Sequence, residues 1–142
     1  MAITYLPPDE GEGLTVLGER TTLRVRRPSY SVFEHTAGPG QGLPPHVHDE
    51  QDEAIYVLDG EYQLSSGDDS LLLGPGSVAV VPRGIPHALT ATGGGPARCL
   101  QIFDPPGSME RFFDEARSVG AREEDVLLVA RRLGIHLLTS PV

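Results

Sequence analysis

Three histidines and one glutamate in this chain have the residue types and the spacing of a metal-binding site. His46 and His48 are separated by a single residue, Glu53 follows five residues later, and His87 comes 34 residues after Glu53. Side chains two residues apart on a β-strand point to the same face, so both imidazoles of the pair would face one pocket. Imidazole suits divalent iron, nickel, copper and zinc, and a carboxylate adds a ligand that iron, manganese or zinc tolerates. Each residue alone is ordinary, but together they predict a divalent transition metal site, and four ligands on an octahedral ion leave two positions for substrate or O2.

The other two histidines and the cysteine fit structural roles better. His35 lies on an expected strand and is expected in the core or on the surface, although it could line the pocket. His136 follows the last expected helix and is interpreted as a packing or interface residue. Cys99, the single cysteine, is expected to be a small buried hydrophobe, since no base partner for a nucleophile is recognisable. One cysteine excludes an intrachain disulfide and makes the reducing cytoplasm the expected location.

The elements that must position the four ligands are short strands separated by many turns. Residues 38–107 hold 12 of the 17 glycines and 9 of the 13 prolines, which argues against a helix bundle. Between these turns lie β-type runs. They cover residues 21–27, 30–36, 54–58, 61–65, 71–73, 77–81, 88–92 and 98–103. Many short strands at close spacing predict an all-β sandwich or barrel.

The pattern changes after residue 107, where two short helices are expected. Ser108 is a suitable N-cap for the first helix, and Gly120 and Gly134 are suitable ends for the two helices. Met109, Phe112 and Phe113 fall at helical spacing and are interpreted as packing residues. We therefore expect one domain over residues 1–142, with a barrel core at about 14–104 and C-terminal helices at about 108–134 that pack on the barrel or on a partner subunit.

Charge and hydropathy exclude two classes of partner. The formal net charge is −9, from 20 acidic and 11 basic residues, so neither a nucleic acid nor an anionic membrane surface is an expected partner. No apolar run approaches the ~18 residues of a membrane span, and the first residues do not read as a secretory signal. A small molecule is the expected partner.

The stretch around the histidine pair resembles the first conserved motif of the cupin superfamily. That motif is a glycine, five residues, His-x-His, three or four residues, a glutamate, six residues and a glycine. Gly40, His46, His48, Glu53 and Gly60 occupy its fixed positions.

The stretch around the third histidine resembles the second cupin motif. Gly76, Pro82, Gly84 and His87 occupy its fixed positions, and Ala91 stands where the motif has an asparagine. That asparagine is not a usual ligand, so its replacement leaves the metal site intact. The two motifs span residues 40–91, and the strand pattern extends the resemblance to about residues 14–104. Within cupins the chain is more similar to small, single-domain, quercetin-dioxygenase-like proteins. This resemblance implies a jelly-roll β-barrel with a metal inside, a short C-terminal helical extension and a homodimer.

Strand alternation extends the prediction to the wall of the pocket. If Glu53 points inward, Ile55 and Val57 also point inward, and if His87 does, Leu89 and Ala91 do so too. This wall is apolar and favours an apolar or aromatic ligand over a sugar phosphate. The resemblance to the family adds enolic and polyketide-like molecules to the expected ligands.

The resemblance implies a dioxygenase with iron as the first choice of metal, and manganese, nickel, zinc and copper as alternatives. Glu53 would ligate the metal or act as general base, with a pKa raised by the apolar wall. A second hypothesis is an isomerase, lyase or cyclase that uses the metal as a Lewis acid. A third is a small-molecule-binding cupin without catalysis.

Overall fold

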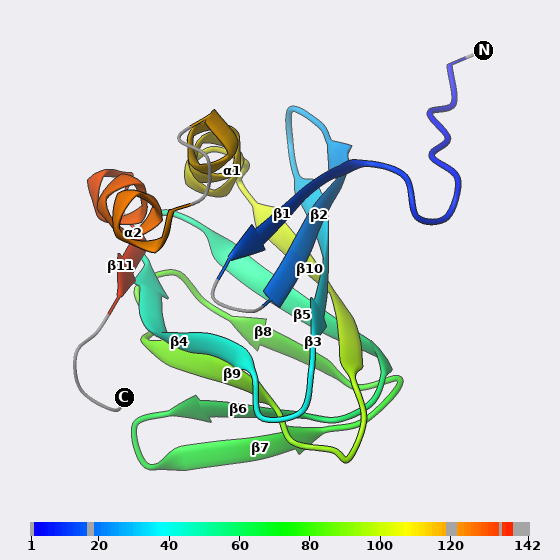
Figure 1. Cartoon of the computed structure of the whole chain (residues 1–142), viewed down its shortest axis with the longest axis vertical. Helices are drawn as coiled ribbons and strands as arrows, with labels where there is room; N and C mark the ends of the chain where they lie inside the picture. Colours follow the sequence, from blue (N-terminus) through cyan, green and yellow to red (C-terminus); the bar gives the residue numbers. More distant parts are fainter. Residues whose placement is uncertain (1, 17–18, 119–121, 134, 138–142) are drawn as a thin grey trace.

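Two antiparallel sheets face each other and enclose a barrel, with two helices at one end (Figure 1). The computed structural model describes residues 2–16, 19–118, 122–133 and 135–137. The strands are β1 (Glu12–Val16), β2 (Glu19–Arg26), β3 (Ser31–Ala37), β4 (Gly42–His48), β5 (Asp52–Asp59), β6 (Tyr62–Ser66), β7 (Asp69–Leu73), β8 (Val78–Val81), β9 (His87–Ala91), β10 (Ala97–Asp104) and β11 (Ile135–Leu137). The helices are α1 (Ser108–Ser118) and α2 (Glu123–Arg132).

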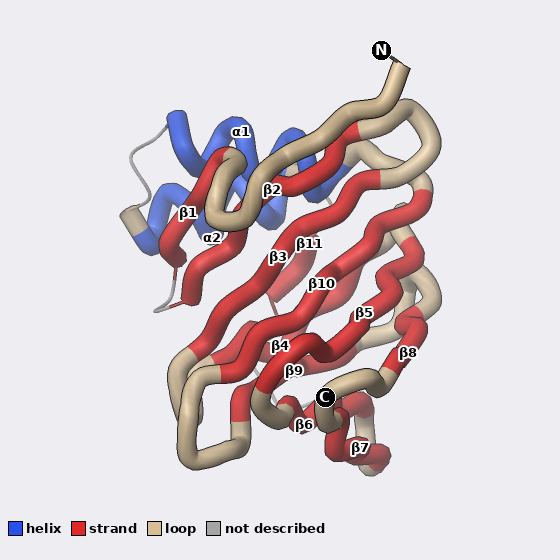
Figure 2. Tube along the Cα trace, turned by 90° about the vertical axis from the view of Figure 1, so that its right-hand side faces the viewer, coloured by secondary structure: helices blue, strands red, loops and turns tan. Residues whose placement is uncertain are grey.

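One sheet has the strand order β1-β2-β3-β10-β5-β8, and the other has the order β11-β4-β9-β6-β7. Figure 2 shows the first sheet face-on, with its strands side by side in that order. Neighbours far apart in sequence, such as β3 and β10, pair across the sheet. The predicted all-β jelly-roll barrel with a short helical extension is confirmed.

Two short edge strands were absent from the sequence prediction. β1 pairs with β2, and β11 pairs with β4, where Ile135 lies opposite His48 and His136 lies opposite Val47. β11 has three residues, too few for a period-2 pattern, so its pairing partner rather than its own sequence makes it a strand. Gly120 and Gly134, the expected helix ends, lie outside the described residues.

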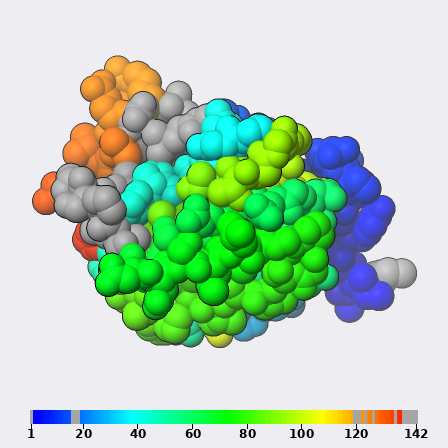
Figure 3. All heavy atoms as spheres, turned by 90° about the horizontal axis from the view of Figure 1, so that it is seen from below, coloured from blue at the N-terminus to red at the C-terminus, as the bar shows by residue number. Residues whose placement is uncertain are grey.

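Alternating inward residues divide the interior into two apolar clusters. The cluster at the end away from the helices contains Ala37, Ile55, Val57, Tyr62, Leu64, Leu73, Val81, Leu89, Ala91, Ala97 and Cys99. In Figure 3 the strands drawn in green cover this end with closely packed side chains. The cluster beneath the helices contains Leu14, Leu23, Phe33, Phe103, Phe113 and Ala116.

The start of α1 is fixed by a side chain from the loop between β4 and β5. The sequence had suggested Ser108 as the N-cap, but Ser108 is instead the first helical residue. The buried Gln51 accepts hydrogen bonds from Ser108 Oγ at 2.9 Å and from the Met109 backbone N–H at 3.0 Å, and its own amide donates to the Pro105 carbonyl at 2.6 Å. Because Gln51 lies between β4 and β5, the helix is tied to the loop that joins two ligand-bearing strands.

Two glycines of the barrel, Gly60 of the first motif and Gly42, are required for different reasons. Gly60 has φ +73°, and a Cβ there would lie 2.6 Å from the Pro96 carbonyl oxygen. Gly42 is the first residue of β4, where a Cβ would collide with the Leu89 backbone of β9. The first glycine is needed for a left-handed turn and the second for the close approach of two strands.

Candidate metal centre

The three predicted imidazoles come from two paired strands of one sheet. His46 and His48 alternate with Val47 on β4, and His46 lies directly opposite His87 on β9. A bulge at the two prolines before His46 shifts the register of β4 against β9. Glu53 arrives from the facing sheet, on β5. The barrel thus brings all four residues together across its interior.

The four side chains are close-packed and buried. One nitrogen from each of His46, His48 and His87 lies within 4.8 Å of the others, a spacing that could hold a metal ion. His87 Nε2 lies 3.4 Å from Glu53 Oε2, and His48 Nε2 lies 3.8 Å from Glu53 Oε1. Glu53 is 1% exposed. A carboxylate and three imidazoles withdrawn from water in this way need a compensating partner.

Hydrogen bonds on the far side of two rings orient them. His46 Nδ1 lies 2.7 Å from the Pro44 carbonyl, and His87 Nδ1 lies 3.0 Å from the Ile85 carbonyl. A carbonyl only accepts, so each Nδ1 carries a proton and Nε2 is the nitrogen of each ring that is left to face the cluster. Ligating histidines are held in this way in metal sites.

Unpartnered polar atoms show that the residues fit a cation. Both oxygens of Glu53 and Nε2 of His87 are buried without a hydrogen-bond partner. Such atoms are costly in a protein interior. A divalent cation would satisfy all of them at once, and nitrogen and oxygen donors suit a transition metal.

The electrostatics correct one expectation. Burial lowers the pKa of His46 to about 3, assisted by the neighbouring His48 and His87. Burial also lowers the pKa of His48, against the attraction of Glu53. Burial would raise the pKa of Glu53, but its contacts with His87, His48 and His46 together lower it. The prediction of a raised Glu53 pKa was therefore wrong, since it considered the apolar wall without the imidazoles.

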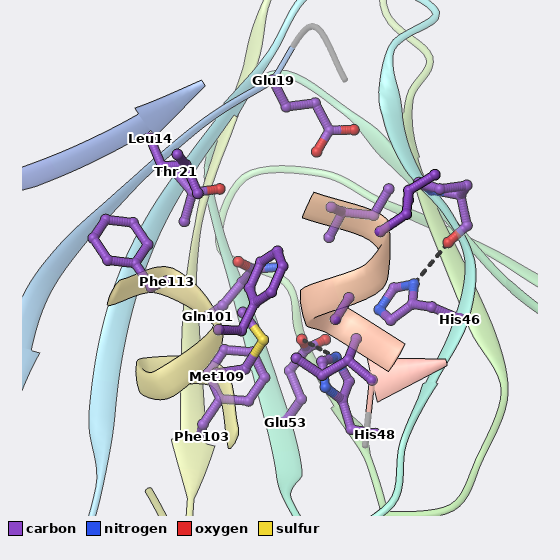
Figure 4. A pocket seen from close by; sticks show the side chains of 16 residues that line it. Leu14, Glu19, Thr21, His46, His48, Glu53, Gln101, Phe103, Met109 and Phe113 are labelled. Atoms are coloured by element: carbon purple, nitrogen blue, oxygen red, sulfur yellow. Dashed lines mark hydrogen bonds and ion pairs between the residues drawn. The ribbon is translucent and has the colours of Figure 1, made fainter. Parts of the chain in front are cut away.

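A cavity of about 90 Å³, partly open to solvent, lies beside the cluster (Figure 4). A single water needs about 10–15 Å³, so the space admits several waters or a compact organic molecule. Its lining comprises Leu14, Glu19, Thr21, Leu43, Pro44, His46, His48, Glu53, Gln101, Phe103, Met109, Phe112, Phe113, Leu127, Ala130 and Ile135. Aromatic and aliphatic side chains from the barrel and from both helices make most of this wall.

The predicted pocket residues lie elsewhere. Ile55, Val57, Leu89 and Ala91 point inward and are fully buried, as strand alternation requires. They belong to the closed apolar cluster away from the helices, and none of them lines the cavity. Alternation fixes the face on which a residue lies, but not which end of the barrel is filled.

Sequence reasoning missed most of the residues that surround the cavity. Met109, Phe112 and Phe113 were interpreted as packing residues alone, yet they also form its helical wall. Gln101 and Glu19 are buried polar residues on strands, and both face the cavity. The available signal was a polar residue at an inward position of an otherwise apolar alternation.

The neighbouring charges face outward. Asp52 pairs with Arg83, and Asp49 lies 2.6 Å from His136 Nε2, so the acidic loop is a surface feature apart from Glu53. Arg98 pairs with Glu34 and Asp59 on the outside of the barrel. Among the described residues, no arginine lines the cavity.

Comparison with known proteins places the motifs in a family. The model of the Cupin domain matches residues 33–103, a stretch that includes all four cluster residues. Quercetin 2,3-dioxygenase of Bacillus subtilis is 40% identical over 84 residues, which are 55% of this chain and 25% of that protein. Germin-like protein subfamily 2 member 2 of Arabidopsis thaliana is 32% identical over 117 residues, which are 78% of this chain and 53% of that protein. This chain thus spans a quarter to about half of the length of these two relatives.

Solved structures agree on the fold. KdgF from Halomonas sp. superposes with a TM-score of 0.69 at 20% identity, covering 75% of this chain and 99% of that one. The polyketide cyclase RemF from Streptomyces resistomycificus gives a TM-score of 0.64 at 23% identity, covering 74% of this chain and 82% of that one. At these identities the likeness concerns the barrel alone. Together with the matched domain model and the inward histidines, it shows that the chain belongs to the cupin family.

Proposed function

We propose that this cupin is a metal-dependent dioxygenase that acts on a small aromatic, enolic or polyketide-like molecule. The observation that carries the proposal is the buried cluster of His46, His48, His87 and Glu53, with unpartnered donor atoms, at the wall of an apolar cavity. The similarity to a quercetin 2,3-dioxygenase over 84 residues supports the choice of oxygenation.

The protein residues have separable roles in this proposal. His46, His48 and His87, with Glu53, would hold a divalent metal, iron being the first choice. When bound, that ion would supply redox chemistry with O2 and Lewis acidity toward an oxygen of the substrate. Glu53, whose pKa is lowered by the imidazoles, is ionised at neutral pH; it would either ligate the metal or, away from the metal, accept the proton of an enol or phenol at a carboxylate oxygen.

The cavity wall determines which molecules enter. Phe103, Met109, Phe112 and Phe113 present aromatic and thioether surface, which favours a flat apolar ligand. No arginine of the described part of the chain lines the cavity, which disfavours polyanionic ligands. The apolar wall also limits the contact of bulk water with the reacting groups.

Elemental analysis tests the proposal first. Protein purified without oxygen should contain about one iron per chain, and oxygen uptake should rise with a member of a panel of phenols and enols. Absence of any transition metal would refute the metal centre. Metal without oxygen uptake for any compound would refute the dioxygenase.

A non-redox reaction of the isomerase, lyase or cyclase type is the second candidate. Three imidazoles and one carboxylate also suit zinc or nickel, which would act as Lewis acids here. Zinc or nickel in the purified protein, with turnover unchanged when oxygen is removed, would favour this candidate. A protein that binds the panel compounds without converting them would instead be a binding module.

Two further features belong to the proposal. We propose a homodimer, and the exposed apolar side chains Tyr56, Val78 and Val80 on β5 and β8 are the surface that we expect it to bury. Light scattering would give about twice the chain mass if this is right.

Neither helix in the described part of the chain has the length and apolar content that a membrane crossing requires. With Cys99 as a free thiol, a reducing cytoplasm is the proposed location.

A further inference from the structure

A second buried carboxylate lines the cavity away from the histidines. Glu19, the first residue of β2, is 2% exposed and forms part of the cavity wall. Figure 4 shows it on the opposite side of the cavity from Glu53 and His48, with Gln101 between them. Its Oε1 is buried and has no hydrogen-bond partner. The cavity therefore has two polar ends joined by an apolar wall.

The other oxygen of Glu19 is held by a buried histidine. His35 Nε2 lies 2.7 Å from Glu19 Oε2, and His35 Nδ1 lies 3.0 Å from the hydroxyl of Tyr62. Burial raises the pKa of Tyr62, so its phenol keeps its proton. The Tyr62 hydroxyl contacts His35 both at Nδ1 and at its backbone carbonyl, to which it donates over 3.4 Å, so the imidazole is held from both sides while Nε2 faces the carboxylate. His35 and Tyr62 are both fully buried and fix Glu19 in this orientation.

An ion pair that served only the fold would not need a cavity at its free end. His35 occupies Oε2, while Oε1 has no partner among the described residues, on the wall of a cavity that Leu14, Thr21 and Phe113 also line. A buried carboxylate oxygen without a donor is unfavourable unless a molecule in the cavity supplies one. We therefore expect a ligand in the cavity to donate a hydrogen bond to Oε1 of Glu19.

We propose that Glu19 is a specificity-determining residue that accepts a hydrogen bond from the far end of the bound molecule. The ligand class is a compact aromatic compound that carries one oxygen for the histidine end and a hydrogen-bond donor at the opposite end. That donor is a hydroxyl or a protonated amine, since the cavity offers no cation to an acid there. The proposal rests on the proposed function in so far as the same cavity binds the substrate.

The test compares the affinities of matched probes by isothermal titration calorimetry. Zinc-loaded protein is used because zinc has no redox chemistry. Hydroquinone is compared with phenol, and 4,4′-dihydroxybiphenyl with 4-phenylphenol, so that each pair differs by one distal hydroxyl. Tyramine tests a distal ammonium group against the distal hydroxyl. The wild type should prefer one distal donor by about tenfold or more, the value of a hydrogen bond to a charged group.

The Glu19→Gln variant should lose that preference and retain its affinity for the probe without the distal donor. A merely structural role would weaken both members of a pair equally and would overturn the proposal, as would a wild type without any preference. Glu19→Asp keeps the carboxylate and should keep a preference for the longer probe, which guards against a folding defect in the first variant. Repeating the titrations with metal-free protein separates the two proposals. A Glu19-dependent preference that persists where no metal binds supports the inference even if the metal centre fails.

Discussion

Replacing His48 by alanine should abolish stoichiometric metal binding. His48 lies on β4, 3.8 Å from Glu53 on the facing sheet, and His87 comes from β9, 34 residues after Glu53, so the ion would join β4 and β5 to a strand that is far away in the unfolded chain. A ligand set of this kind exists only in the native state, and metal binding therefore adds directly to the free energy of unfolding.

The size of the effect follows from mass action. At a free zinc concentration about 100 times Kd, the wild type gains about 2.7 kcal/mol. With an unfolding entropy of about 2.1 cal/mol/K per residue, a chain of 142 residues should show a Tm rise of about 9 °C. If the loss of one ligand weakens binding by about a hundredfold, the gain at the same zinc concentration falls to about 0.4 kcal/mol, a rise of about 1 °C.

Scanning calorimetry with and without zinc measures the shift, and plasma mass spectrometry measures the metal content. His136→Ala is the matched control, because this histidine lies on the adjacent strand β11 but is 42% exposed and bonded to Asp49. It should keep full metal content and the full Tm rise. One equivalent of zinc with an unchanged Tm rise in the His48→Ala protein would refute the assignment of the site.

Three other predictions concern the frame around the site. Gln51→Ala removes three hydrogen bonds at the start of α1 and should cost about 2–3 kcal/mol in urea unfolding, whereas Gln63→Ala on the surface should stay within about 0.5 kcal/mol. Burial raises the pKa of Cys99 to about 12 from 9.0. The native protein should therefore resist thiol reagents at neutral pH. The Cys99 thiol keeps its proton in the native protein at a pH where the unfolded chain has released it. The free energy of unfolding should therefore fall as the pH rises from about 9 to 12, and Cys99→Val should reduce that fall. Gly60 has φ +73° and faces a backbone carbonyl, so Gly60→Ala should lower the free energy of unfolding by more than the roughly 1–2 kcal/mol that a left-handed conformation costs alone. Gly67 has φ +58° and no neighbour within 4 Å, so Gly67→Ala should lower it by that conformational cost only.

The sequence by itself determined the fold and the residues of the cluster. The period of two places His46 and His48 on one face, and the glycines and prolines restrict where the chain turns. Glu53 and His87 follow at motif spacing, and these local constraints are strong enough to identify the cupin barrel. The pairing of His46 with His87 and the approach of Glu53 from the other sheet agree with that expectation.

Only the tertiary structure decided where the cavity opens and what surrounds it. Ile55 and Leu89 have the inward orientation that alternation requires, but the far end of the barrel is filled, and the space lies beneath α1 and α2. The sign of the Glu53 pKa shift depends on imidazoles from two other strands. The Glu19–His35 contact joins residues 16 apart in the chain through strand pairing. Local patterns fix the face of the strand on which a side chain lies. Its depth of burial, its contacts and the electric field around it depend on how the sheets and helices pack.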